Sequence, residues 1–157
     1  MFEVVETLTK NKETIATMES CSGGAIVNAI TNIPGASEVL KYSAVTYANE
    51  FKIKMGVNKE TIDKYSVYSM EVAKEMSKNI SLFANSTYGI GITGKINRAD
   101  PYNNSGEDNK IFISIYNSKN DTYNTFNLIA KDMDRIGNKE YIVTSVANKL
   151  LEIFRNS

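Results

Sequence analysis

Histidine is absent from this chain of 157 residues. Because Ser-His-Asp triads and Cys-His dyads need an imidazole base, its absence excludes both kinds of catalytic site. Metal sites built on imidazole are excluded as well, and no dense carboxylate cluster resembles a calcium-binding loop. We therefore expect no bound metal. A nucleophile in this chain would need another base, and lysine is the main candidate.

Cysteine occurs once, at Cys21, which excludes a framework of internal disulfides. The chain also lacks a net charge, because 18 basic residues balance 18 acidic ones. We therefore expect no nucleic-acid partner held by bulk charge. No apolar run approaches the length of a membrane span, and the first residues, MFEVVETLTKNKET, carry acids where a signal peptide carries bases. We therefore expect a cytoplasmic protein without a membrane partner.

The pattern of apolar residues predicts a single domain over residues 1–157. Helical spacing and capping signals predict helices at 2–11, 22–33, 49–56, 69–85 and 134–154, with a further helical turn at 61–65. Short runs of β-forming residues predict strands at 13–19, 41–48, 87–93, 110–117 and 121–130. This order of elements is typical of a three-layer α/β/α domain, with helices on both faces of a mixed sheet.

The segment Ser20–Gly24 lies between the first strand and the second helix. Backbone N–H groups at a helix N-terminus are unpaired and carry partial positive charge, so they can bind a phosphate or stabilise an oxyanion. Gly23 and Gly24 would let a ligand approach the backbone closely. An ordinary turn with Ser22 as the helix N-cap is an equally good interpretation. Cys21 has no histidine to activate it, so we expect a small buried residue rather than a nucleophile.

Lys52 is the candidate base, and it ends the segment VTYANEFK. Tyr47 lies at the end of the second predicted strand, and Asn49 lies at the start of the helix that follows. Because the carboxyl ends of parallel strands meet at one edge of a sheet, Ser20 and Lys52 can come together there. Desolvation lowers the pKa of a lysine, and a neutral lysine can deprotonate a serine. The alternative is that Lys52 lies on an ordinary solvated helix face.

The third predicted strand ends in the segment GITGKINRADP, at 91–101. Thr93 and Gly94 would reach the same edge of the sheet and can contact a ligand there. Residues 95–109 form a polar loop, and its asparagine-rich part, 97–109, is the only segment long and polar enough to act as a lid or a specificity loop. An ordinary surface loop is the alternative.

Three cationic side chains in or near these segments can pair with an anionic group of a ligand. Lys95 and Arg98 belong to the polar loop, and Arg135 opens the last predicted helix. For Arg135 the alternative is a surface arginine in a capping segment.

The chain resembles the CinA C-terminal domain family, the nicotinamide-nucleotide amidases also called PncC. Members of that family read Glu-Ser-Cys-Thr-Gly-Gly, then Ile-Thr-x-x-Pro-Gly-Ser-Ser, then Val-Thr-Tyr-x-Asn-x-x-Lys. This sequence has ESCSGG at 19–24, ITNIPGAS at 30–37 and VTYANEFK at 45–52. The resemblance covers nearly the whole chain, and the pairing of the first and third motifs is fairly specific.

The resemblance implies a three-layer α/β fold, usually in a homodimer. It implies hydrolysis of the carboxamide of a small nucleotide substrate, nicotinamide mononucleotide, which yields nicotinate mononucleotide and ammonia. It also implies a reaction that uses a serine and a lysine, without a metal or another cofactor. This last point agrees with the expectation, drawn from the absence of histidine alone, of a lysine base and no bound metal.

Carried over position by position, the resemblance makes Ser20 the nucleophile and Lys52 its base. Ser22 is the alternative nucleophile. The remaining residues would orient the lysine or the substrate (Tyr47 and Asn49), or give N–H donors to the oxyanion or a phosphate (Ser22, Gly23 and Gly24).

Two segments depart from the family pattern. The family continues its third strand with Ile-Ala-Gly-Pro and later a Lys-Pro-Val-Gly approach to the next strand, whereas this chain has Ile96, Asn97 and Arg98 and an asparagine-rich loop. The family's late Gly-Asp-Arg and a following Arg become Met133-Asp134-Arg135 and Lys139. One wall of the pocket is therefore rewritten, which leaves open an amidase with an altered substrate and a nucleotide-binding or regulatory module without activity.

Overall fold

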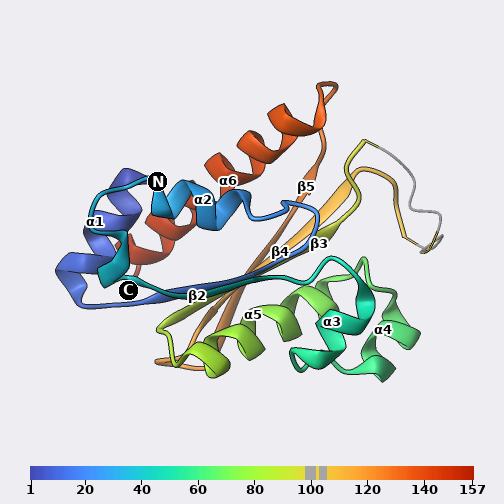
Figure 1. The fold of residues 1–157 in the computed structure, drawn as a ribbon, viewed down its shortest axis with the longest axis horizontal. Coiled ribbons are helices and arrows are strands. Elements are labelled where there is room, and N and C mark those ends of the chain that lie inside the picture. Colours follow the sequence, from blue (N-terminus) through green and yellow to red (C-terminus); the bar gives the residue numbers. More distant parts are fainter. Residues whose placement is uncertain (98–101, 103–105) are drawn as a thin grey trace.

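The computed structural model describes residues 1–97, 102 and 106–157, and five strands in this part form one mixed sheet (Figure 1). The strand order is β2-β1-β3-β4-β5, with β1 parallel to β2 and β3, and β4 antiparallel to β3 and β5. The strands are β1 (Ile15–Glu19), β2 (Leu40–Val45), β3 (Tyr88–Gly94), β4 (Lys110–Asn117) and β5 (Thr122–Ile129). The predicted α/β class and mixed sheet are confirmed.

Helices cover both faces of the sheet (Figure 1). One layer holds α1 (Phe2–Asn11), α2 (Ala25–Thr31) and α6 (Arg135–Arg155). The other holds α3 (Asn49–Lys54), α4 (Lys59–Tyr65) and α5 (Met70–Ala84), and a short 3-10 turn, η1 (Ala36–Glu38), precedes β2. Among the described residues, none of the helices combines the length and the hydrophobicity that a membrane span requires.

Strand β3 packs differently on its two faces because its residues alternate between large and small. Tyr88, Ile90 and Ile92 are fully buried in the core beneath α1, α2 and α6. Gly89 and Gly91 face α5, and a Cβ on Gly91 would lie 2.3 Å from the carbonyl oxygen of Ala73. The helix therefore lies directly on the strand, which only glycine allows at this distance.

Replacing Gly91 with alanine should destabilise the fold, because α5 must move away from β3 to make room for the methyl group. We expect the free energy of unfolding to fall by about 1–3 kcal/mol, measured by chemical denaturation. Gly137→Ala is the matched control, since its new methyl would meet the sulfur of the flexible Met133 side chain, 2.8 Å away, which can shift. Equal stability of the Gly91→Ala variant and the wild type would contradict this account of the packing.

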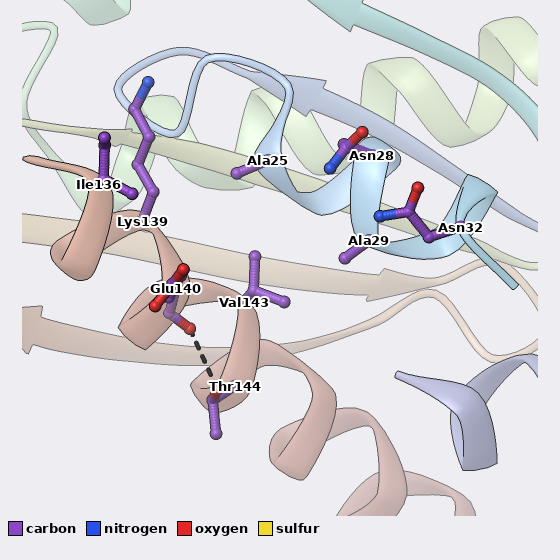
Figure 2. A pocket seen from close by; sticks show the side chains of 9 residues that line it. All are labelled: Ala25, Asn28, Ala29, Asn32, Ile136, Lys139, Glu140, Val143 and Thr144. Carbon is purple, nitrogen blue, oxygen red and sulfur yellow. Dashed lines mark hydrogen bonds between the residues drawn. The ribbon is translucent and has the colours of Figure 1, made fainter.

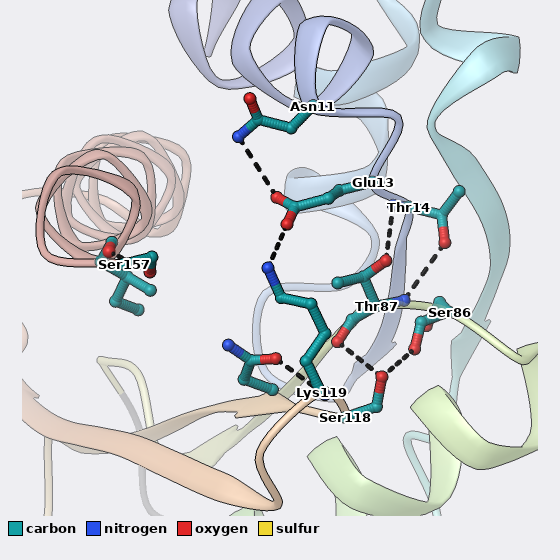
Figure 3. A network of polar contacts seen from close by, with 10 residues as sticks. Asn11, Glu13, Thr14, Ser86, Thr87, Ser118, Lys119 and Ser157 are labelled. Carbon is teal, nitrogen blue, oxygen red and sulfur yellow. Dashed lines mark hydrogen bonds and ion pairs between the residues drawn. The ribbon is translucent and has the colours of Figure 1, made fainter.

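A polar network closes the edge of the sheet where β1 and β3 begin (Figure 3). The N–H groups of Thr14 and Thr87 each donate to the other's hydroxyl, at 3.1 and 3.2 Å. Lys119, in the β4–β5 turn, forms an ion pair with Glu13, and a hydrogen bond to that carboxylate raises the pKa of Lys119. This edge is thus closed by contacts within the fold, whereas the opposite edge carries the candidate site.

The carboxyl ends of β1, β2 and β3 meet at that opposite edge, as predicted from their parallel order. Most element boundaries differ from the prediction by one or two residues, and two larger differences lie at the site. The second strand ends at Val45 rather than at residue 48, and the second helix begins at Ala25 rather than at residue 22. Both differences free backbone groups that the site uses.

Candidate active site

Ser20 and Lys52 meet at this edge of the sheet, as expected. Ser20 follows the last residue of β1, and Lys52 lies in α3, which starts soon after β2 ends. The Nζ atom of Lys52 lies 3.1 Å from the Oγ atom of Ser20. Lys52 is 1% exposed and Ser20 is 7% exposed. The alternative prediction, that Lys52 lies on a solvated helix face, is therefore wrong. Burial of a lysine against a serine hydroxyl is an arrangement that serves nucleophilic catalysis.

Two backbone carbonyls hold the Lys52 amine in place. Lys52 Nζ donates to the carbonyl oxygen of Thr46 at 2.6 Å and to that of Tyr47 at 3.3 Å. These carbonyls are available because the ladder of β2 ends at Val45, while Thr46 still donates its N–H to the backbone carbonyl oxygen of Glu19 at 2.8 Å. A neutral amine has two hydrogens, which these carbonyls can accept, and a lone pair, which can then face Ser20. An ammonium would instead donate to all three oxygens, so the site accommodates both protonation states.

Glu19 organises the turn after β1, and the sequence analysis missed it. Its side chain is fully buried. One carboxylate oxygen accepts from the Ser22 hydroxyl at 2.7 Å and from the N–H groups of Gly24 and Ile26 at 3.1 and 3.2 Å. The other accepts from the N–H of Val27 at 2.8 Å. Glu19 therefore caps α2 from the preceding strand, a favourable place for a negative charge.

This network changes which donors are available to a ligand. The N–H of Gly23 donates to the carbonyl of Ser20 at 2.9 Å, and that of Gly24 is held by Glu19. Within the described part of the chain, the backbone N–H groups of Cys21 and Ser22 make no hydrogen bond to another residue. They directly follow Ser20, which is where the donors of an oxyanion hole are commonly found.

Ser22 is less suited than Ser20 to attack a substrate. Its side chain is fully buried, and its hydroxyl donates to Glu19 rather than contacting Lys52. The residue is not the helix N-cap either, because that position belongs to Gly24 and the capping oxygens come from Glu19. Ser22 thus contributes to the shape of the turn.

Tyr47 and Arg135 form the solvent-facing part of the site. The Tyr47 side chain is 64% exposed, and its hydroxyl lies 3.5 Å from the guanidinium of Arg135. Arg135 also donates to the carbonyl of Ile96 at 2.6 Å, which ties the start of α6 to the end of the β3 segment. Tyr47 contacts Lys52 through the backbone carbonyl of Tyr47, while its hydroxyl lies near Arg135.

The other predicted residues lie around the same edge. Thr93 is fully buried and donates its hydroxyl to the carbonyl of Val67 at 2.9 Å, so it joins β3 to the segment before α5. Gly94 ends β3 beside β4, and Asn49 is half-buried at the start of α3.

Lys95 is buried and forms an ion pair with Asp108. The predicted Arg98 lies outside the described residues, as do the other residues of 98–101 and 103–105 in the polar loop.

Cys21 is buried beside Ser20, as expected from its residue type. Burial raises the pKa of its thiol to about 12, although the nearby cations Lys52 and Arg135 act in the opposite direction. Since only the thiolate is nucleophilic, Cys21 is unsuited to catalysis at neutral pH.

The thiol of native protein should therefore react very slowly with iodoacetamide. At pH 8 a pKa of about 12 leaves roughly one thiol in ten thousand ionised, and the labelling rate should rise about tenfold for each pH unit towards that pKa. Intact-mass spectrometry of native and urea-unfolded protein measures this, with full labelling expected only after unfolding. Rapid labelling of the folded protein at pH 8 would refute the assignment.

Residues 1–154 match the family model of the CinA C-terminal domain. The chain belongs to the CinA C-terminal domain family. A competence-damage inducible protein of Clostridium botulinum (strain ATCC 19397 / Type A) is 37% identical over 160 residues, which cover 98% of this chain and 36% of that protein. A similarly named protein of Caldanaerobacter subterraneus is 46% identical over 92 residues, covering 58% of this chain and 22% of that protein. This CinA C-terminal domain thus matches only the smaller part of these relatives.

Solved structures of CinA proteins share the fold. The competence/damage inducible protein CihA of Agrobacterium tumefaciens superposes with a TM-score of 0.85 at 25% identity, covering 96% of this chain and 90% of that one. A CinA superfamily protein of Klebsiella pneumoniae superposes with a TM-score of 0.88 at 21% identity, covering 99% and 96%. The described residues of this domain contain no group of three or more Cys, Asp or Glu side chains that could hold a metal ion.

Proposed function

We propose that this CinA C-terminal domain is a metal-independent amidohydrolase, which hydrolyses the carboxamide of nicotinamide mononucleotide to nicotinate mononucleotide and ammonia. The observation that carries the proposal is the 3.1 Å contact between the buried Lys52 amine and the Ser20 hydroxyl. Membership of the family and the resemblance of its motifs support the choice of substrate.

In the first half of the reaction, Ser20 Oγ attacks the carboxamide carbon while Lys52 Nζ takes the hydroxyl proton. The electron pair of the carbonyl moves onto its oxygen, and the N–H groups of Cys21 and Ser22 stabilise the negative charge there. Lys52 then gives its proton to the amide nitrogen, and the C–N bond breaks as the carbonyl re-forms. Ammonia departs, and an ester remains on Ser20.

In the second half, water attacks the ester carbon and gives its proton to Lys52. The bond to Ser20 Oγ breaks, Lys52 returns the proton to that oxygen, and the acid product leaves as a carboxylate after it loses its remaining proton to solvent. Thr46 and Tyr47 hold the amine through both halves, since their carbonyls accept hydrogen bonds in either protonation state. Glu19 keeps the turn in the shape that exposes the two N–H donors.

Ammonia release from a panel of small amides tests the proposal. The panel contains nicotinamide mononucleotide, nicotinamide riboside, nicotinamide, glutamine and asparagine, incubated with purified folded protein. We expect turnover of nicotinamide mononucleotide well above that of the free amides. Absence of turnover with every amide would overturn the proposal.

A nucleotide-binding or regulatory module without hydrolytic activity is the second candidate. The observation that favours it is the departure at Ile96 and Asn97, whose neighbourhood is now tied to α6 by Arg135. It predicts a higher melting temperature with nicotinamide mononucleotide and no product. Hydrolysis that depends on Ser20 would exclude it.

A further inference from the structure

Three cations surround the turn that carries Ser20. Lys52 contacts Ser20 itself, and Arg135 lies near enough to Cys21 to influence its thiol. The Nζ atom of Lys139 lies 3.0 Å from the point that a Cβ on Gly23 would occupy. Arg135 and Lys139 are four residues apart on α6, so they share one face of that helix.

The N-terminus of α2 is closed to an anion from outside. Helix N-termini commonly bind phosphates through their unpaired N–H groups. Here the buried carboxylate of Glu19 already accepts from the N–H groups of Ile26 and Val27, and its charge repels a second anion. An anionic part of a substrate must therefore find its partners elsewhere around the turn.

Lys139 is the cation that is open to such a ligand. It is half-buried, and within the described residues it makes no ion pair or hydrogen bond, in contrast to Lys95, which pairs with Asp108. It lines a groove of about 560 Å³ between α2 and α6, which also includes Ala25, Asn28 and Val143. Figure 2 shows the Lys139 side chain reaching from α6 towards the loop that precedes α2.

We propose that Lys139, with Arg135 beside it, binds the phosphate group of the substrate while its carboxamide lies at Ser20. This assignment rests on the proposed amidase function. Ser20 and Gly23 are the ends of a hydrogen-bonded turn, so their Cα atoms lie within about 7 Å. A mononucleotide that carries a carboxamide at one end and a phosphate at the other can bridge the two places. Lys139 is then a residue that determines specificity for phosphorylated amides.

Steady-state kinetics with matched substrates test the assignment. Nicotinamide mononucleotide and nicotinamide riboside differ only in the phosphate. For Lys139→Met we expect the KM of the mononucleotide to rise about tenfold to a hundredfold with kcat little changed, and the KM of the riboside to stay the same. Lys139→Arg should restore most of the affinity. Lys149→Met, on the same helix in an exposed pair with Glu152, is the control and should behave as wild type.

Binding to a Ser20→Ala background separates this assignment from the amidase proposal, because it needs no turnover. Calorimetry with nicotinamide mononucleotide should give a dissociation constant that rises about tenfold or more when Lys139→Met is added. That result without hydrolysis of any amide would retain the phosphate site and refute the amidase. Hydrolysis or binding of the mononucleotide that is unaffected by Lys139→Met, or equal losses for both substrates, would overturn the phosphate site. So would the absence of both turnover and binding.

Discussion

Replacing Ser20 with alanine should lower kcat/KM for nicotinamide mononucleotide at least about a thousandfold, because it removes the hydroxyl that lies 3.1 Å from Lys52 Nζ. The side chain is small and nearly buried, so its loss should leave the fold intact. Ammonia release measures the activity, and chemical denaturation of both proteins checks the fold.

Ser22→Ala is the matched comparison for this result. It removes the hydroxyl that Glu19 accepts at 2.7 Å, so we expect it to lower stability by about 1–3 kcal/mol without removing the nucleophile. If Ser22→Ala abolished ammonia release and Ser20→Ala did not, the nucleophile would be Ser22 and the account of the turn would be wrong.

Replacing Lys52 with methionine should cause a loss of similar size in kcat/KM, at least about a thousandfold. Methionine fills a comparable buried space but cannot take the serine proton or return it to the leaving nitrogen. The carbonyl of Thr46 loses the donor it has at 2.6 Å, so stability should also fall, by about 1–3 kcal/mol. Ammonia release and denaturation are measured on the same preparation.

Lys54→Met is the control for this substitution. Lys54 lies in the same short helix, but its side chain is 63% exposed and its ion pair with Glu50 is exposed as well. Such pairs contribute little to stability, and we expect near wild-type behaviour. Substantial activity in folded Lys52→Met protein would exclude Lys52 as the base.

Much of the fold follows from local patterns in the sequence. Ser69 caps α5 through the N–H of Val72, as its residue type predicts, and the alternation in β3 places isoleucines against one layer and glycines against the other. The two boundaries that differ at the site are set by a side chain that contacts the backbone six to eight residues away, which residue type alone does not reveal. The start of α2 depends on the carboxylate of Glu19, and the end of β2 depends on the carbonyls that Lys52 takes.

The candidate site could be predicted from the sequence only in part. Parallel strands place their carboxyl ends together, which predicts the meeting of Ser20 and Lys52. Glu19 was missed because an acid at the end of a short strand has no spacing that distinguishes it from a surface residue, and only its full burial reveals its role. Lys139 reaches Gly23 only because α6 packs beside α2, and sequence spacing cannot reveal this. The homodimer implied by the resemblance stays a prediction.

The central claim is that an ester forms on Ser20 during the reaction, and partitioning of this acyl group tests it most directly. Nicotinamide mononucleotide and the methyl ester of nicotinate mononucleotide would give the same ester on Ser20. With hydroxylamine present, we expect the same ratio of hydroxamate to acid from both substrates, and neither product from Ser20→Ala. Ratios that differ between the two substrates would show that water attacks the amide directly, and would contradict the account.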